Sequence, residues 1–380
     1  MRFKLTVMTG RRLLLLGLVI GIVPPAVAQT VAGRGAARPQ APASAATGEG
    51  TRAAAPPASP AEPMAAAFSP QKAADYLDAI AVAWTRERKC GTCHTNYAYM
   101  MGRPALGREN RAIAGEIRAF FADKVAQRSS NPPLPHALIL AGVLSINDAE
   151  TTRHLDPITR QALDRMWELQ GPDGAWEYPT SFYSPPLGDS YYGAAFAALA
   201  VGIAPDGYAD TPAARAGMEK LRHYLTSHRA PSLHHQSILL WASTKTPGLL
   251  TAEQQAATIR ELLQHQRADG GWSLRSLGDW KRRDGSLNNP DAESDGYATG
   301  LVVYVLRQAG LPATDGAIGR GAAWLKTHQR QSGRWFTFSI NTDERRDDNR
   351  YTDHLISNIG TAYAVMALRA CGELQDTDSR

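Results

Sequence analysis

Two kinds of helical pattern alternate along residues 68–374 of the chain. In the first kind, of which residues 252–266 are the clearest case, apolar residues recur on one face and polar residues cover the other. Thr251 and Gln254 have the spacing of a capping box at the start of that segment. In the second kind, small or aliphatic residues occupy every face, which predicts a buried helix. Runs of this second kind cover residues 193–201, 300–306 and 360–368.

The two patterns pair into helical hairpins, each with an amphipathic outer helix followed by a buried inner helix. Less regular pairs are predicted at residues 70–88 with 95–106, 109–127 with 135–146, and 212–228 with 233–243. Together with the three buried runs, these pairs give about six hairpins. One such hairpin cannot bury both of its faces, so repeated hairpins stack until the ring closes. We therefore predict an all-α fold, an α/α toroid of the α6/α6 barrel type, without alternating strands.

One turn signature, Q-x3-G-x-W, follows an outer helix three times. It comprises Gln170, Gly174 and Trp176; Gln266, Gly270 and Trp272; and Gln329, Gly333 and Trp335. Such turns on the outer helices of an α/α toroid resemble the terpenoid cyclase and protein prenyltransferase superfamily, above all the C-terminal domain of squalene-hopene cyclases. The resemblance covers residues 68–374 at the level of the repeat. It implies that the six glutamine and tryptophan side chains stabilise the fold by tying each outer helix to its neighbour.

The chain departs from that family in its acidic residues. Squalene cyclases carry a D-x-D-D motif whose acid protonates the polyprene, and they have a second barrel, whereas this chain has one toroid and no such motif. At the corresponding place stand Asp291, Glu293 and Asp295. Two roles stay open for these candidate catalytic residues: a neutral buried acid that donates a proton, or loop residues that cap the following helix.

The two ends of the chain differ in composition from the predicted toroid. Residues 1–28 have the basic start, apolar stretch and Ala-Val-Ala end of a signal peptide, which predicts an exported, periplasmic protein. Residues 29–67 are rich in Ala, Pro, Gly, Ser and Thr, so we expect a disordered linker. Residues 375–380 form a C-terminal tail. No later apolar run is long enough for a transmembrane segment.

The charge of the chain argues against a nucleic-acid partner. The 41 Lys and Arg residues exceed the 36 Asp and Glu residues, but most of the excess belongs to the predicted signal peptide. The remaining basic residues form no concentrated stripe, so nucleic-acid binding is excluded.

Cys90, Cys93 and His94 spell C-x-x-C-H, the pattern to which haem c is attached. Two thiols at this spacing bond to the haem vinyl groups, and the histidine becomes an axial ligand of the iron. The alternatives are a Cys90–Cys93 disulfide and a zinc site, although no fourth zinc ligand is evident. We predict haem c as the cofactor. Candidates for the distal iron ligand are His136, His235 and His354.

The outer-to-inner connections of a toroid all lie at one end, so the inner helices all begin at the same opening, here called the mouth. The residues predicted to line the mouth are His136, Asp189, Tyr192, His235, Asp295, Tyr297, His354 and Asn358. A few polar groups over an apolar interior are typical of a ligand site. The C-x-x-C-H motif falls at the same end.

These observations lead to three functional hypotheses. The leading one is an exported toroid that carries haem c and acts in electron transfer or as a haem oxidoreductase, with an unknown redox partner or a small apolar ligand. The second is a terpene or triterpene cyclase-like isomerase that uses the carboxylates near Asp295. The third is a non-catalytic toroid that binds lipid or protein. Serine-hydrolase and phosphate-loop motifs are absent from the sequence.

Overall fold

The computed structural model describes residues 57–89, 91, 94–107, 110–127, 134–178, 186–282, 285–341 and 349–374. The predicted signal peptide, residues 29–56 of the predicted linker and the predicted tail lie outside the described residues. Residues 51–380 form one compact unit. In the described ranges, regular structure is helical apart from two isolated β-bridges, and none of these helices is long and apolar enough to cross a membrane.

Outer and inner helices alternate along the described chain. The outer helices are α1 (Pro70–Arg88), α3 (Arg111–Ala126), α5 (Pro157–Glu168), α7 (Pro212–Ser227), α9 (Ala252–Gln264) and α11 (Gly316–Thr327). The inner helices are α2 (Asn96–Gly102), α4 (Leu134–Glu150), α6 (Ser190–Ile203), α8 (Leu233–Lys245), α10 (Gly296–Gln308) and α12 (Asn349–Ala370). Three short 3-10 helices are η1 (Arg103–Leu106), η2 (Tyr208–Asp210) and η3 (Leu274–Ser276).

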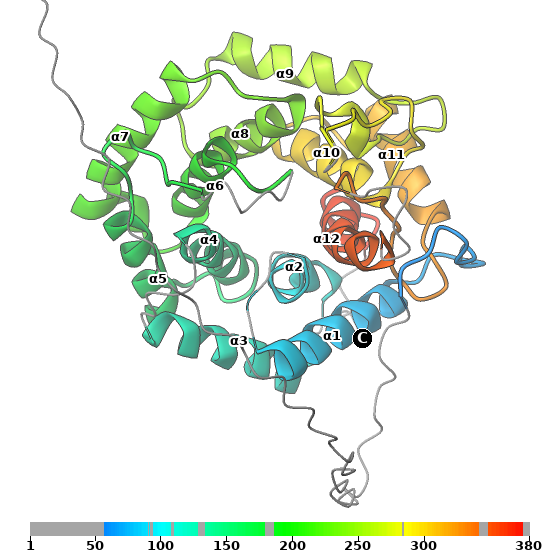
Figure 1. Ribbon diagram of the computed structural model, residues 1–380, viewed down its shortest axis with the longest axis horizontal. Helices are drawn as coiled ribbons and strands as arrows, with labels where there is room; N and C mark the ends of the chain where they lie inside the picture. The colour runs from blue at the N-terminus through cyan, green and yellow to red at the C-terminus, as the bar shows by residue number, and fades with distance from the viewer. Residues whose placement is uncertain are drawn as a thin grey trace, which may run out of the picture. The chain divides into compact units, whose positions relative to one another are not determined.

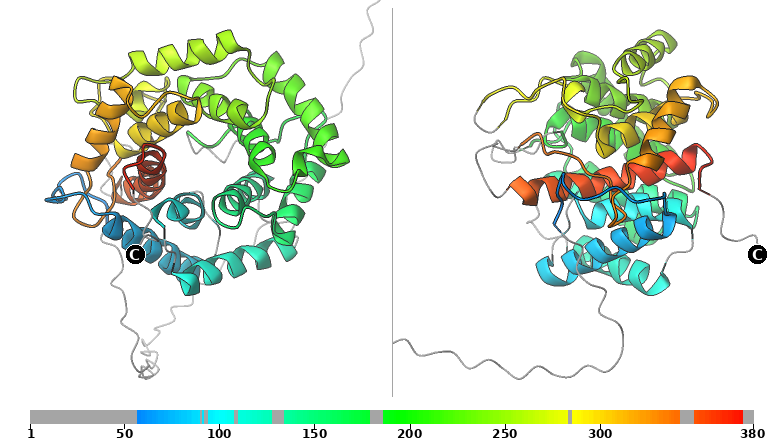
Figure 2. Two further views of the ribbon diagram at one scale, coloured as in Figure 1. Left: turned by 180° about the vertical axis from the view of Figure 1, so that it is seen from behind. Right: turned by 90° about the vertical axis from the view of Figure 1, so that its right-hand side faces the viewer.

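The inner helices form a closed ring. Each contacts the next inner helix in chain order, and α12 contacts both α10 and α2. Figure 1 shows the outer helices arranged around this ring, and Figure 2 shows the same arrangement from behind and from the side. The predicted all-α toroid is therefore confirmed.

The inner helices are buried along most of their length because outer helices and neighbouring inner helices surround them. In α6 every residue from Tyr191 to Val201 is buried, and so is the start of α10 as far as Leu306. Gly300 allows α10 to approach α12 closely, since a Cβ atom there would lie 2.5 Å from the backbone nitrogen of Ala364. Burial of apolar area contributes about 25 cal/mol per Å², so this dense ring is the main source of stability.

The three Q-x3-G-x-W turns share one hydrogen-bond geometry. In the second copy, the Gln266 amide donates to the carbonyl of Gly270 in its own turn and to that of Ala317 in α11, both at 2.8 Å. The indole N–H of Trp272 donates to the carbonyl of Leu262 in α9 at 2.7 Å. Gln170 with Trp176, and Gln329 with Trp335, make the same set of contacts. Each turn thus joins two outer helices, because its glutamine donates to a backbone carbonyl at or near the start of the next helix and its tryptophan donates to a carbonyl in the last turn of the preceding one.

The third copy of the turn closes the outer ring. Gln329 follows α11, and its amide exchanges two hydrogen bonds with the backbone of Ser69, the N-cap of α1, at 2.7 and 3.0 Å. Gly333 has a φ of +96°, and a Cβ atom there would lie 2.1 Å from the carbonyl oxygen of Lys72 in α1. Glycine is required at this point because any side chain would push the last turn away from the first outer helix.

Residues 57–67, which the composition places in the linker, lie against this third turn. Met64 forms an antiparallel β-bridge with Arg330. The carboxylate of Glu62 lies 3.1 Å from Nε of Arg334, whose side chain is fully buried. Backbone pairing and a buried ion pair therefore fix a segment that has few large apolar residues, and the folded unit begins before residue 68.

Replacing Gln266 by alanine should destabilise the fold by about 1–3 kcal/mol, because the carbonyls of Gly270 and Ala317 would each lose a donor. Gln264→Ala is the matched control, since Gln264 lies two residues away with an exposed side chain. Urea unfolding of the two variants measures the difference. Equal stability of Gln266→Ala and Gln264→Ala would contradict the structural role of the turn.

Candidate functional site

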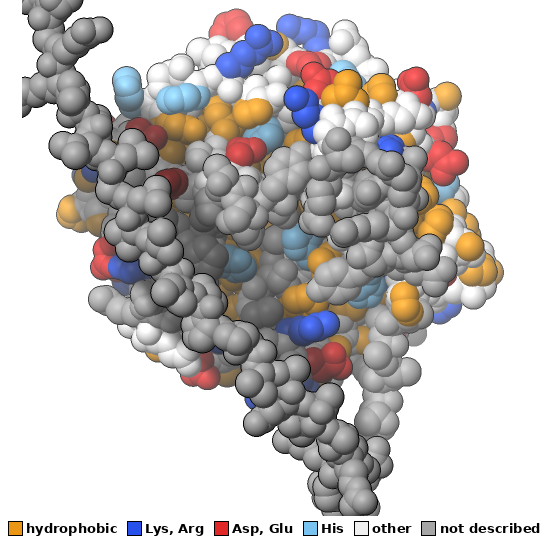
Figure 3. Space-filling view, in the orientation of Figure 1, with side chains coloured by type: hydrophobic (Ala, Val, Ile, Leu, Met, Phe, Trp, Pro, Cys, Tyr) orange, Lys and Arg blue, Asp and Glu red, His pale blue; other side chains and the backbone are white. Residues whose placement is uncertain are grey.

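The outer-to-inner connections gather at one end of the toroid. In the right-hand view of Figure 2, the loop between α9 and α10 projects at the end opposite the C-terminus. Figure 3 looks onto this end and shows histidine and hydrophobic side chains together near its middle. Inner helices begin here, so their N-cap residues bring polar groups to an otherwise apolar ring.

Asp189, His235 and Ser232 form a hydrogen-bonded chain at the mouth. Asp189 is the N-cap of α6, and one of its oxygens accepts from the backbone N–H of Tyr192 at 2.9 Å. Its other oxygen lies 2.7 Å from Nε2 of His235. Nδ1 of His235 lies 2.7 Å from the hydroxyl of Ser232, the N-cap of α8. Two helix starts are thus linked through one imidazole.

Two members of this hydrogen-bonded group, Asp189 and His235, differ in their exposure to solvent. The side chain of Asp189 is 45% exposed, whereas that of His235 is 2% exposed. Burial alone would raise the pKa of Asp189, but the hydrogen bond and charge of His235 and the N–H groups of Tyr192 and Tyr191 outweigh it. The pKa of Asp189 therefore lies below its usual value, and the carboxylate is ionised at neutral pH.

His234, which the sequence analysis did not single out, lies beside the hydrogen-bonded group of Asp189, His235 and Ser232. Its Nε2 is 2.9 Å from the hydroxyl of Tyr297, and its ring stacks on Tyr192 at a centroid distance of 6.1 Å. Burial, with a smaller effect of His235, lowers its pKa well below the usual value. His234 is therefore neutral, and Tyr192 and Tyr297, both predicted at the mouth, meet at its ring.

The three predicted catalytic carboxylates do not form one group. Asp295 is buried as the N-cap of α10: one oxygen accepts from the N–H of Ala298 at 2.9 Å and the other from that of Leu274 at 2.6 Å. Burial raises its pKa to about 6, against the effect of these donors. These contacts are those of the capping role that the sequence had left open beside catalysis.

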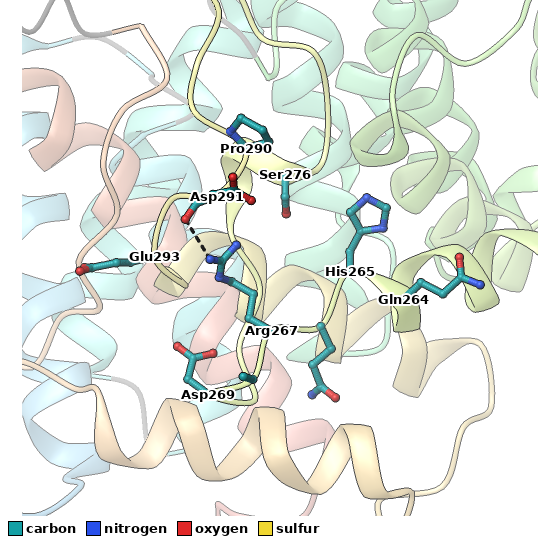
Figure 4. A pocket seen from close by; sticks show the side chains of 10 residues that line it. Gln264, His265, Arg267, Asp269, Ser276, Pro290, Asp291 and Glu293 are labelled. Carbon is teal, nitrogen blue, oxygen red and sulfur yellow. Dashed lines mark hydrogen bonds between the residues drawn. The ribbon is translucent and has the colours of Figure 1, made fainter.

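Asp291 and Glu293 instead line an open pocket of about 640 Å³ outside the ring, shown in Figure 4. The guanidinium of Arg267 lies between them and donates to the backbone carbonyl of Asp291 at 2.9 Å. Asp295 does not line this pocket. With Asp269, the pocket therefore brings together three exposed acids and an arginine, without the buried acid that proton donation to an alkene needs.

The proposed haem-binding residues are only partly described. Cys90 and Cys93 lie outside the described residues, whereas His94 precedes α2. Burial, together with the charge of nearby His136, lowers the pKa of His94 to about 4. Among the residues that the structure describes, no group of three His, Cys, Asp or Glu side chains is placed to hold a metal ion.

The other two distal-ligand candidates have different surroundings. His235 lies between Asp189 and Ser232, as described above. Nδ1 of His354 lies 3.2 Å from a guanidinium nitrogen of Arg334. The last predicted mouth residue, Asn358, accepts a short hydrogen bond from the hydroxyl of Tyr76. Only His136 is therefore brought close to His94.

No protein-family model and no curated protein matches this chain. Solved structures are similar to it. A polysaccharide lyase is 12% identical, with a TM-score of 0.49, and the alignment covers 80% of this chain and 97% of that one. A possible member of the GH105 family from Salmonella enterica subsp. enterica serovar Paratyphi A is 12% identical, with a TM-score of 0.44 and coverage of 79% and 82%. The α-1,6-mannanase GH76A from Salegentibacter sp. HEL1_6 is 11% identical, with a TM-score of 0.42 and coverage of 81% and 90%.

The functional hypotheses need correction. The similar structures named above are a polysaccharide lyase, a possible GH105 member and a mannanase, and their likeness to this chain concerns the fold. The Asp295 carboxylate, on which the cyclase hypothesis depended, is engaged at a helix cap through both oxygens. Haem-based electron transfer, terpene cyclisation and non-catalytic lipid or protein binding are therefore not retained as the function. The squalene-cyclase resemblance holds only for the toroid.

His354→Gln should make stability less sensitive to acid. Burial and the charge of Arg334 lower the pKa of His354 to about 4, below the unfolded value of 6.5. The wild type therefore loses stability as the pH falls from about 6.5 towards 4, by more than about 1 kcal/mol, since each pKa unit corresponds to about 1.4 kcal/mol. Urea unfolding at pH 7 and pH 5 measures this loss, with exposed His223→Gln as the control. An equal acid-induced loss in both variants would rule out the effect.

Proposed function

We propose that the protein binds and processes a glycan at the toroid mouth, with Asp189 and His235 as its proton-transfer pair. The observation that supports this proposal is the 2.7 Å contact between a half-exposed carboxylate and a buried imidazole. The rings of Tyr191 and Trp280 lie 6.0 and 6.2 Å from that imidazole. Aromatic rings around a few polar groups are typical of ligand sites. Both rings are buried and hold the imidazole in place, so the polar groups of the mouth are those that the hydroxyl groups of a sugar would meet.

The carboxylate of Asp189 orients the imidazole of His235 so that one ring nitrogen can accept a proton. An ionised carboxylate only accepts hydrogen bonds, so Nε2 of His235 carries the proton that faces Asp189. Nδ1 then keeps its lone pair and is the proton acceptor. Asp189 fixes this tautomer and stabilises the imidazolium that forms when Nδ1 takes a proton, which passes to it through the Ser232 hydroxyl 2.7 Å away.

His235→Gln and Asp189→Asn should each lower glycan processing by about 100-fold or more, because the base or its orienting carboxylate is lost. The measurement is mass spectrometry of products from a panel of polysaccharides, after a glycan array has identified those that the wild type binds. Asp279→Asn is the control, since Asp279 is an exposed aspartate of the adjoining loop. The absence of any bound glycan, or full activity of both variants, would overturn the proposal.

A second proposal concerns the cofactor and the compartment. Residues 1–28 would direct export, and Cys90, Cys93 and His94 would then hold haem c, the cysteines through thioether bonds and the histidine as an iron ligand. Support comes from the C-x-x-C-H motif and from the position of His136, which is close enough to lower the pKa of His94. Burial lowers the pKa of His136 as well, so both imidazoles are neutral at pH 7, as iron ligation requires. His136 is the favoured distal ligand, because His235 and His354 have other partners.

Co-expression with a haem c maturation system should yield a pyridine haemochrome spectrum that survives acid-acetone extraction. Replacing Cys90 and Cys93 together by serine should abolish it, and His136→Ala should shift the Soret band. Exposed His154→Ala is the control for the histidine change. Complete extraction of haem from the wild type would refute covalent attachment, and an unchanged band in His136→Ala would refute the distal ligand.

A further inference from the structure

The hydroxyl of Ser232 is closer to an imidazole than to the backbone group that it caps. As the N-cap of α8, Ser232 accepts from the backbone N–H of His235 at 3.4 Å. The same hydroxyl lies only 2.7 Å from Nδ1 of His235. The cap distance is ordinary for this chain, since the N-cap side chain of Thr211 accepts at 3.3 Å. The shorter contact with the imidazole is what distinguishes this hydroxyl from a cap alone.

The direction of the hydrogen bonds follows from their partners. Nε2 of His235 faces the Asp189 carboxylate, so it carries the ring proton, and Nδ1 is left as the acceptor. In the neutral imidazole the Ser232 hydroxyl then donates to Nδ1. The order is hydroxyl, imidazole, carboxylate, with each proton pointing toward the carboxylate. This is the polarity that activates a serine as a nucleophile, although the two imidazole nitrogens have exchanged places relative to the usual triad.

Ser232 lies at the partly exposed start of α8, while His235 is buried behind it. Gly278, in the loop between α9 and α10, packs closely against the serine: a Cβ atom added there would lie 2.8 Å from Cβ of Ser232. A glycine at this position thus allows the loop to reach the start of α8 without displacing the serine side chain. The approach to the hydroxyl is bordered by residues of two different hairpins.

From this geometry we infer that Ser232 is the nucleophile of an esterase activity that removes O-acyl groups from the bound glycan. The inference rests on the proposed glycan function and names its substrate class, an O-acylated sugar. Its chemical requirement is an ester carbonyl that reaches Ser232 while the sugar lies at the mouth.

The reaction takes place in two balanced steps. Oγ of Ser232 attacks the acyl carbon, its proton moves to Nδ1 of His235, and the ester C–O bond breaks as that proton passes to the sugar oxygen. Water then attacks the acyl-serine, gives a proton to Nδ1 and releases the carboxylic acid, and the proton returns to Oγ. Asp189 stays ionised throughout and stabilises the imidazolium. No other reactant is needed.

The sequence concealed this arrangement because its three members do not form a known motif. Ser232 and His235 are three residues apart at a helix start, where a serine reads as an N-cap. Asp189 is 46 residues from His235 and caps a different helix. Only the ring, which places α6 beside α8, brings the carboxylate to the imidazole.

The test uses the full chain and a fluorophosphonate probe, followed by peptide mass spectrometry and by hydrolysis of p-nitrophenyl acetate and acetylated xylan. The wild type should be labelled on Ser232 and release acetate. Ser232→Asn should lose labelling and lower kcat/KM by about 1000-fold or more, because the nucleophile is gone while a good N-cap remains. Ser276→Ala is the control, since its hydroxyl donates to a backbone carbonyl in η3. It should stay within about twofold of the wild type.

The outcomes separate this inference from the function on which it rests. A folded wild type that binds glycan, but is neither labelled nor active on esters, overturns the esterase inference and leaves the glycan proposal standing. Labelling that persists in Ser232→Asn also overturns it. Ester hydrolysis that depends on Ser232 in a protein that binds no glycan supports the nucleophile and refutes the proposed substrate class.

Discussion

Closure of the helical ring is the constraint on which the rest of this structure depends. Each hairpin has an inner helix that is apolar on every side, so it is stable only when both neighbours cover it. The glutamine of each Q-x3-G-x-W turn joins one outer helix to the next by donating to a carbonyl of its own turn and to one at or near the start of the next helix. Gln329 makes the corresponding bonds with Ser69 and so joins the last outer helix to the first. The turns therefore supply directional bonds that apolar packing alone does not provide.

Closure of the ring also brings the polar residues of the mouth together. A helix start needs an acceptor for its free N–H groups, and in this fold the inner helices all start at one end. Asp189 and Ser232 meet that need for α6 and α8, and His235 lies between them. Groups required for folding are thus also the groups that form a proton-transfer chain. Asp295 differs from Asp189, because both of its oxygens accept from backbone N–H groups and its side chain is buried.

The sequence predicted the toroid and its helix pairs well, because helical periodicity, prolines at helix starts and repeated turns are local signals. It could not show which carboxylate would meet an imidazole, since Asp189 and Asp295 look alike before a helix. His234 was missed because α8 is buried on every side, so no face of the helix distinguishes one histidine from the next. Residues 57–67 were predicted to be linker, because composition does not reveal the ion pair that Glu62 forms with the distant Arg334. These differences all concern contacts between hairpins, which a local pattern does not encode.

The segment at residues 57–67 also bears on the order in which the chain folds. Its contacts with the third turn, like those of Ser69 with Gln329, join residues about 260–270 positions apart. Loop-closure entropy opposes such contacts until the intervening hairpins have formed, so they belong to the end of folding. Until then, the first and last hairpins each expose one apolar side, which is the condition under which partly folded chains aggregate. The ion pair of Glu62 with Arg334 thus belongs to the contacts that form late, and it shortens the time for which those apolar sides stay exposed.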